Sequence, residues 1–225
     1  MIELNGVTKI FNQGAANEFC ALKDISLCIE TGMVNCLQGP SGSGKTTLLS
    51  LIACLSRPTL GRILLDKRPV SGLPERFMAE IRRNTFGFVF QRFNLISGLS
   101  VAGNVMIPAY PAGPVYKALV EKTAGLLTRF GLESKAETPV EHLSGGEAQR
   151  VAICRALIND PDIIIADEPT ANLDSRLSLE FMDILGRLHD LGKSIILSSH
   201  DPQVYNSAVV QRKISMHDGQ IVSAE

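Results

Sequence analysis

The segment from Gly39 to Thr46, with the sequence GPSGSGKT, constrains this chain more than any other feature. It matches the pattern G-x-x-x-x-G-K-[ST] and lies between an apolar run, Met33 to Leu37, and an amphipathic run that starts near Lys45. The first run predicts a strand and the second a helix, which is the context in which this pattern forms a phosphate-binding loop. Glycines let the backbone turn tightly and aim its N–H groups inward, and the helix adds the positive end of its dipole. The sequence therefore predicts a triphosphate site rather than a flexible glycine- and serine-rich loop.

Two side chains of this loop have expected roles in binding a triphosphate. Lys45 would reach the β- and γ-phosphates as a point charge, and the Thr46 hydroxyl would be a ligand of Mg²⁺. The loop backbone would surround the phosphates with N–H donors. We expect the nucleotide to be bound here by Gly39, Pro40, Ser41, Gly42, Ser43, Gly44, Lys45, Thr46 and Thr47.

Composition narrows the class of protein that carries this loop. The chain has 225 residues, 45% of them apolar and 20% charged, which suits one α/β domain with a smaller subdomain. A net charge of −1 supplies no basic field, so we expect no nucleic-acid partner. Apolar runs such as Leu51 to Leu55 fall far below the roughly 18 residues of a membrane span, and no leader pattern opens the chain. We therefore expect a soluble, cytosolic protein.

The five cysteines are odd in number and form no C-x-x-C pair. We expect them to be reduced core residues rather than disulfide partners or metal ligands.

The N-terminal part is predicted to be antiparallel. Residues Ile2 to Ile10 and Ile25 to Ile29 alternate apolar with polar residues, and a turn-like stretch, residues 14–17, lies between them. Phe11 and Phe19 would lie at the tip of this hairpin. Either ring could supply the flat face on which adenine stacks, and a strand-end core position is the alternative for both.

Three later strands are predicted to end in polar side chains. They are Gly87 to Phe90, Ile163 to Ala166 and Ser194 to Leu197. Ligands of open α/β sheets collect at the carboxyl ends of strands, beside the phosphate loop. Carboxylates there suit Mg²⁺ coordination and activation of an attacking water, although two adjacent acids can also form an ordinary solvated turn. The residues delivered to this edge are Gln91, Asp167, Glu168 and His200.

The middle of the chain differs from the rest in composition and pattern. From Arg92 to about Pro139 it consists of Gly- and Pro-punctuated loops with two helical stretches, the clearer being Tyr116 to Phe130, which predicts an inserted helical subdomain. Phe93, Leu95, Ile96 and Leu99 place large apolar groups in the loop after Gln91, which either pack on this subdomain or line a groove for a partner's helix.

A second glycine-rich helix start follows at Ser144-Gly145-Gly146-Glu147. Ser144 is suited to be the N-cap, with Glu147 completing a capping box. A helix N-terminus with exposed amides can also bind a γ-phosphate, so a structural and an anion-binding role both remain open.

Taken together, these stretches resemble the ordered motifs of ABC-type ATPase subunits, and the resemblance covers nearly the whole chain. The stretches are Gly39 to Thr46, Gln91, Leu143 to Glu147, Asp167-Glu168, Leu173-Asp174 and His200. Three longer stretches are similar to the macrolide-export and lipoprotein-release branch: Gly87 to Leu95, Ala166 to Asp174 and Ser199 to Val204. Phe11 stands where the family usually has the tyrosine that stacks on adenine.

The resemblance implies a fold and an assembly. The fold is a P-loop NTPase core with a mainly parallel sheet, an N-terminal antiparallel β subdomain and an inserted helical subdomain. Residues 1–91 and 155–225 would form the core, and residues 92–154 the helical subdomain with its signature motif. Two subunits, expected to be identical, would form a head-to-tail dimer, with ATP held between the phosphate loop of one and Ser144, Gly145, Gly146 and Glu147 of the other.

The resemblance also implies roles for single residues and partners. Glu168 would be the general base, Asp167 and Gln91 would serve Mg²⁺ or its waters, His200 would contact the γ-phosphate, and Asp174 would bridge to the second subunit. The chain would power an integral membrane permease from the inner face of the membrane, for export or extraction of a lipoprotein, macrolide or peptide. The alternatives are a soluble ABC ATPase in DNA repair, translation or cell division, and a regulatory module that does not hydrolyse ATP.

Overall fold

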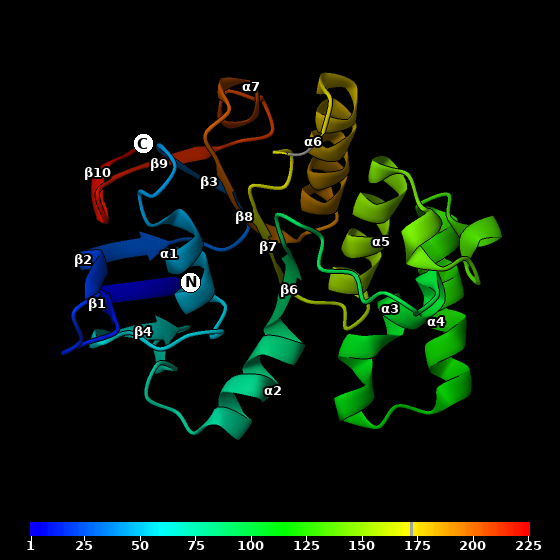
Figure 1. Ribbon diagram of the computed structural model, residues 1–225, viewed down its shortest axis with the longest axis horizontal. Helices are drawn as coiled ribbons and strands as arrows, with labels where there is room; N and C mark the ends of the chain where they lie inside the picture. Colours follow the sequence, from blue (N-terminus) through cyan, green and yellow to red (C-terminus); the bar gives the residue numbers. More distant parts are fainter. Residues whose placement is uncertain (172) are drawn as a thin grey trace.

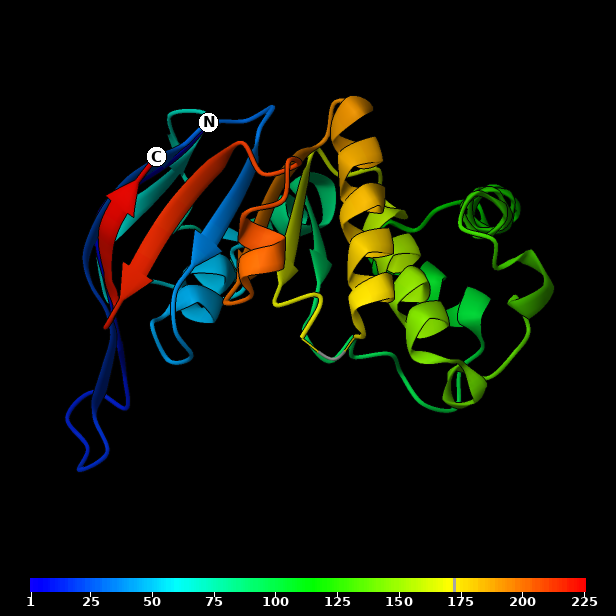
Figure 2. The ribbon, with the colours of Figure 1, turned by 90° about the horizontal axis from the view of Figure 1, so that it is seen from above.

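The computed structural model describes residues 1–171 and 173–225 and arranges them as two β-sheets and a group of helices (Figure 1). Asn172, which belongs to one of the stretches with a family resemblance, lies outside the described residues. Seen from above, the sheets occupy one end of the molecule and the helical part the other, with α6 (Ser175–Asp190) between them (Figure 2).

The larger sheet is mainly parallel and has the strand order β10-β9-β3-β8-β7-β6. The strands β3, β6, β7 and β8 are buried almost throughout, because a parallel sheet covered on both faces offers no solvated side, whereas β9 at its margin alternates buried and partly exposed residues. Only β10 runs antiparallel, pairing with β9. The strands are β3 (Val34–Gln38), β6 (Phe86–Val89), β7 (Ile163–Asp167), β8 (Ser194–Ser199), β9 (Arg212–His217) and β10 (Gln220–Ala224).

The smaller sheet is antiparallel, as the alternating N-terminal pattern predicted, and has the order β2-β1-β4-β5. Its strands are β1 (Ile2–Phe11), β2 (Phe19–Ile29), β4 (Leu60–Leu65) and β5 (Arg68–Pro69). One core joins this sheet to α1 (Lys45–Ile52), which buries its apolar side chains between the two sheets. The first turn of α1 is thereby held at the edge where β3 ends.

The opposite face of the parallel sheet is covered by α6 (Ser175–Asp190), α7 (Pro202–Tyr205) and part of α5 (Gly145–Leu157). Earlier in the chain, α2 (Glu75–Thr85) leads directly into β6.

The helical part is built from α3 (Val101–Met106), α4 (Tyr116–Arg129) and three 3₁₀ turns, η1 (Ile107–Ala112), η2 (Glu133–Lys135) and η3 (Val140–His142). It has its own apolar core, to which α5 contributes Val151 and Cys154. The same helix contributes Ala152 and Ile153 to the core under the parallel sheet. The expected boundary between residues 154 and 155 therefore falls inside α5, a continuous helix shared by both parts.

All five cysteines are free. Burial raises the pKa of the Cys36 thiol to about 12, helped by the negative charge of Glu168, and raises the pKa of Cys154 to about 12 and that of Cys54 to about 11. These three thiols are therefore protonated near neutral pH. Within residues 1–171 and 173–225, no helix combines the length and apolar character needed to cross a membrane.

Candidate active site

A hollow of about 270 Å³ lies at the carboxyl edge of the parallel sheet. Because β3, β6, β7 and β8 run parallel, the loops that follow them all reach this edge. We call it the nucleotide hollow, and it is lined by Phe19, Ala21, Ser41, Gly42, Ser43, Gly44, Lys45, Thr46, Thr47, Gln91, Glu168 and His200. The structure thus brings the phosphate loop together with three of the four residues predicted at the strand ends.

The loop conformation explains why glycine stands at position 44. Gly44 has φ +99°, and a Cβ there would lie 2.8 Å from the Ala21 carbonyl oxygen and 2.9 Å from the Leu22 side chain. Helix α1 begins at the next residue without a side-chain cap, which leaves its first-turn N–H groups free of an intrahelical partner. These amides and the dipole of α1 favour an anion in the hollow.

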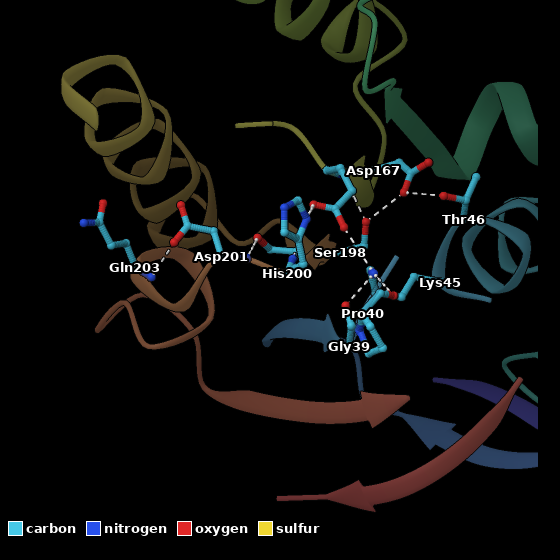
Figure 3. Close-up of polar contacts among 11 residues, drawn as sticks. Gly39, Pro40, Lys45, Thr46, Asp167, Ser198, His200, Asp201 and Gln203 are labelled. Atoms are coloured by element: carbon cyan, nitrogen blue, oxygen red, sulfur yellow. Dashed lines mark hydrogen bonds and ion pairs between the residues drawn. The ribbon is translucent and has the colours of Figure 1, made fainter. Parts of the chain in front are cut away.

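Lys45 is the cation of the hollow, and its side chain is only 5% exposed. Its Nζ donates hydrogen bonds to the carbonyl oxygens of Gly39 at 2.8 Å and Pro40 at 3.0 Å, and lies 3.2 Å from Glu168 Oε1 (Figure 3). A buried ammonium is tolerated only when it is paired in this way. These three contacts therefore fix the position of Lys45 Nζ in the nucleotide hollow.

Glu168 is 8% exposed and joins Lys45 to His200. Its Oε2 lies 2.9 Å from His200 Nδ1, and its backbone N–H donates to Ser198 Oγ at 2.9 Å. Its φ of +43° is uncommon for a residue with a long side chain. The turn that starts here aims the carboxylate into the hollow instead of along the strand.

Asp167 is buried at the end of β7 and is held by two hydroxyls. Thr46 Oγ1 donates to Asp167 Oδ1 at 3.0 Å, and Ser198 Oγ donates to the same oxygen at 2.7 Å. Burial raises the pKa of Asp167, the charge of Glu168 adds to this, and the two hydroxyls and Lys45 oppose it. A hydroxyl, a carboxylate and the amide of Gln91 are the hard oxygen donors that Mg²⁺ prefers.

These donors alone do not make a closed metal cage. No group of three or more His, Cys, Asp or Glu side chains is placed to hold a metal ion in the part of the chain that the structure describes. The donor set fits Mg²⁺ of the type that takes its remaining oxygens from phosphates and water.

Of the two aromatic residues expected to stack on adenine, one lines the hollow and the other does not. Phe19, whose side chain is 59% exposed, lines the hollow, and Phe11 does not. Phe11 is the cross-strand neighbour of Phe19, and Lys9 Nζ lies 5.0 Å from the centre of its ring. Sequence position alone could not separate two aromatics that face each other across a hairpin.

Gly39 and Pro40 occupy the other side of the loop. They line an adjoining hollow of about 380 Å³ together with His200 and Tyr205. Of the predicted loop residues, these two contact Lys45 through their carbonyl oxygens instead of lining the nucleotide hollow.

Ser144 to Glu147, which we call the signature start, forms the predicted capping box. Ser144 Oγ accepts from the Glu147 N–H at 3.3 Å, and Glu147 Oε2 accepts from the Ser144 N–H at 2.8 Å. These hydrogen bonds from Ser144, with its hydroxyl, lower the pKa of Glu147. None of the four residues lines the nucleotide hollow, and α5 lies on the far side of β6 to β8 from α1 in both views (Figures 1 and 2).

Asp174 is also apart from the hollow. It caps α6, accepting from the Leu177 N–H at 2.9 Å, and is exposed. A single chain thus brings together the phosphate loop and the strand-end residues, but neither the signature start nor Asp174.

Two polar residues of this region were not anticipated. Ser198 holds both Asp167 and the Glu168 backbone, because β7 and β8 pair with Asp167 opposite Ser198, and the sequence carried no signal of this register. Gln149, on α5, donates from Nε2 to the Pro169 carbonyl oxygen at 3.1 Å, and nothing in the sequence pointed to this contact.

The four large apolar side chains in the loop after Gln91 differ in burial: two pack on the cores and two are exposed. Leu95 packs against the core of the helical part, as one alternative expected, and also against the core under the parallel sheet, whereas Phe93 packs against the core under the parallel sheet. Arg155 donates to the carbonyl oxygens of Phe93 and Asn94. Ile96 is 48% exposed and Leu99 is 37% exposed, so these two remain available on the surface.

Comparison with known proteins gives a consistent result. The family model described as ABC transporter matches residues 22–171. The chain is 46% identical to the macrolide export ATP-binding/permease protein MacB of Hyphomonas neptunium and 44% identical to the probable syringafactin export ATP-binding/permease protein SyfD of Pseudomonas syringae pv. syringae. Both matches cover 99% of this chain and 34% of the relative, so the chain spans about one third of the length of these relatives.

Solved structures agree with this result. MJ0796, a bacterial ABC transporter cassette solved as a dimer, is similar with a TM-score of 0.91 and 37% identity, covering 100% of this chain and 98% of that one. Its post-hydrolysis state bound to ADP and Pi is similar with a TM-score of 0.90, 36% identity and the same coverage. The chain belongs to the ABC transporter family, as one of its ATPase cassettes.

Proposed function

We propose that this chain binds ATP with Mg²⁺ in the nucleotide hollow and hydrolyses it at a site completed by a second copy. The observation that carries the proposal is the placement of Lys45, Glu168 and His200 around one hollow, with Asp167 hydrogen-bonded to Thr46 of its lining and the signature start outside it. The hollow of one chain therefore contains the phosphate loop and the proposed base but lacks the second anion-binding helix start.

The side chains divide the chemistry between them. Lys45 and the first-turn amides of α1 hold the phosphates, while Thr46, Asp167 and Gln91 hold Mg²⁺ or its waters. Mg²⁺, when bound, neutralises charge on the β- and γ-phosphates.

The attacking water gives its proton to Glu168 as its oxygen bonds to the γ-phosphorus, and the bond to the ADP oxygen breaks. His200, at 2.9 Å from Glu168 Oε2, keeps that carboxylate pointing at the water and reaches the γ-phosphate from its exposed edge. Most of the rate enhancement comes from positioning and charge stabilisation.

The second copy supplies the signature start. Ser144 and Gly145 are exposed at the N-terminus of a helix of 13 residues, where backbone donors and the helix dipole favour an anion. In a two-fold, head-to-tail pair each signature start faces the other subunit's hollow, so that two half-sites become two full sites. Asp174, at the exposed start of α6, is placed to contact the partner. The dimeric form of MJ0796 supports the pairing of two copies.

Phe19 is the better candidate for stacking on adenine. Its ring lines the hollow next to Ala21, whereas Phe11 is covered on one face by Lys9. An exposed ring at the mouth of a phosphate site provides a stacking surface without a partner to displace.

We further propose that ATP hydrolysis drives a membrane-spanning permease part, with the cassette peripheral on the cytoplasmic side of the membrane. The named relatives combine ATP-binding and permease functions for macrolide and syringafactin export, which supports export or extraction of an envelope substrate. A hollow of about 320 Å³ between α2, β6 and η1, lined by Phe88, Phe90 and Pro108, supports docking of a permease helix near Gln91. Ile96 and Leu99, in the loop that follows Gln91, are also exposed apolar side chains.

Two variants test hydrolysis at a shared site. Glu168→Gln should bind ATP but lose about 10²- to 10⁴-fold in rate, and ATP should then trap a dimer. Ser144→Arg should bind ATP with unchanged affinity and also fail to hydrolyse, because its cation occupies the place of the partner's γ-phosphate. Nucleotide affinity, turnover and mass in solution are measured for both. Wild-type turnover by Glu168→Gln would refute the base assignment, and undiminished turnover by Ser144→Arg would mean that each chain works alone.

A further inference from the structure

One buried amide joins the two halves of the proposed active site within a single chain. Gln149 lies in the second turn of α5 and is only 3% exposed. Its Nε2 donates to the Pro169 carbonyl oxygen at 3.1 Å, directly after the proposed base Glu168. A buried amide donor is costly to leave without an acceptor, so this contact is strongly favoured.

The segment that Gln149 reaches is a strained turn, which we call the catalytic turn (Asp167 to Thr170). Glu168 has a positive φ of +43°, a conformation that persists only where surrounding contacts hold it. Ser198 Oγ accepts the Glu168 N–H on the sheet side. Gln149 holds the Pro169 carbonyl on the helix side, so the turn is fastened from both sides.

The other end of this connection is equally well held. The capping box fastens Ser144 to the first turn of α5, and Gly146 is buried so closely that a Cβ there would lie 2.8 Å from the Leu177 side chain. Gln149 is five residues after Ser144 on one continuous helix, a rise of about 7 Å. A shift of the catalytic turn is therefore transmitted to the signature start by a short, rigid segment.

We propose that Gln149 is a positioning residue that ties the catalytic turn to the signature start of the same chain, and thereby couples the two ATP sites of the dimer. The inference rests on the proposed head-to-tail dimer, in which the catalytic turn of one chain belongs to one site and its signature start to the other. When ATP and the attacking water change the position of the catalytic turn in one site, α5 moves with it. The signature start at the other end of this segment then shifts against the γ-phosphate of the other site.

The first test uses Gln149→Leu, which keeps the apolar volume and removes the donor, and Gln149→Glu, which places a carboxylate against the Pro169 carbonyl. We expect kcat to fall about 10- to 100-fold with KM changed less than about twofold, because the base is misplaced and the phosphate loop is intact. The Hill coefficient for ATP should fall from above 1 to about 1.

Asn104→Leu is the matched control. Asn104 is a fully buried amide on α3 whose donors reach the Ile96 and Ser100 carbonyl oxygens, with no contact to the catalytic turn. Its Oδ1 also accepts the Ile96 N–H at 2.7 Å, so Asn104→Leu should lower the melting temperature by at least as much as Gln149→Leu while leaving kcat and the Hill coefficient near wild type. Equal kinetic losses in both variants would assign Gln149 a general stabilising role and overturn the proposal.

Mixed dimers separate local bracing from coupling. In a dimer with one Glu168→Gln subunit, hydrolysis is confined to the site formed by the other subunit's Glu168 and the variant subunit's Ser144. Gln149→Leu is then added to either subunit. We expect the rate of ATP hydrolysis to fall about fivefold or more in both placements. If the rate falls only when Gln149→Leu is in the same chain as the intact Glu168, Gln149 positions its own catalytic turn and does not couple the two sites. Turnover by Ser144→Arg homodimers would instead remove the shared site, and the coupling with it.

Discussion

Ser198→Ala tests the hydrogen-bond arrangement under the catalytic turn. Ser198 is fully buried, donates to Asp167 Oδ1 at 2.7 Å and accepts the Glu168 N–H at 2.9 Å. Alanine leaves the Glu168 N–H as a buried donor without an acceptor, at a cost of about 1–3 kcal/mol, and removes a hydrogen bond to a carboxylate worth about 1.5–3 kcal/mol. Because the two losses share one site and partly relax, we expect the free energy of unfolding to fall by about 3 kcal/mol.

The loss is large enough to measure by thermal melting. For a domain of this size, about 1 kcal/mol corresponds to about 2–4 °C, so Ser198→Ala should melt about 6–12 °C below wild type. Ser199→Ala is the control, since Ser199 is equally buried but only accepts one hydrogen bond, from the Asp201 N–H at 3.0 Å. It should cost about 1 kcal/mol.

The pH dependence has a defined sign. Burial raises the pKa of Asp167 in the folded chain, and the Ser198 hydroxyl opposes that rise. The hydroxyl hydrogen-bonds the ionised carboxylate more strongly than the protonated acid, so its removal raises the folded pKa of Asp167 further. The cost of Ser198→Ala should be largest where Asp167 is ionised in both proteins and should fall as pH drops through its folded pKa, leaving the loss at the Glu168 N–H, which does not depend on pH. The interpretation is wrong if Ser198→Ala melts within about 2 °C of wild type, or if Ser199→Ala is the more damaging change.

Three further predictions concern the phosphate loop, the stacking of adenine and the docking of the permease. Gly39→Ala should abolish ATP binding, measured by calorimetry, because its Cβ would collide with a backbone carbonyl of β9. Phe19→Ala should raise the KM for ATP about tenfold and Phe11→Ala less than twofold, in steady-state kinetics; the reverse order would return the stacking role to Phe11. Ile96→Ala with Leu99→Ala should leave melting and basal turnover near wild type and weaken pull-down of the permease, and normal assembly would move the docking surface elsewhere.

Local patterns predicted most of the fold because the elements follow them closely. Residues Ile163 to Ala166 form a continuous apolar run, and β7 is buried on both faces. Glu147 lies three residues after Ser144, and the capping box is present. The alternation of the first 29 residues appears as the antiparallel pair β1 and β2. In each case the physical cause acts within a few residues, so the sequence contains it.

The remaining features depend on contacts between distant segments. Ser198 and Asp167 are neighbours only because β7 and β8 pair in one register, and Gln149 reaches Pro169 only because α5 packs beside the catalytic turn. The boundary that the family resemblance implied between residues 154 and 155 falls within α5, and only the packing shows that the residues of this helix alternate between two cores.

The central claim is that each ATP site is shared between two chains, and a complementation assay tests it most directly. Ser144→Arg and Glu168→Gln should each be inactive alone, because each homodimer damages both of its sites. A mixed dimer, however, contains one site with an intact Glu168 from one subunit and an intact Ser144 from the other.

Random mixing of the two variants at equal amounts makes about half of the dimers mixed, each with one intact site of two, so turnover should recover to about a quarter of wild type. The measurement is phosphate release before and after mixing and exchange of subunits. Recovery to that level is the predicted result, and a mixture as inactive as its components would contradict the shared site.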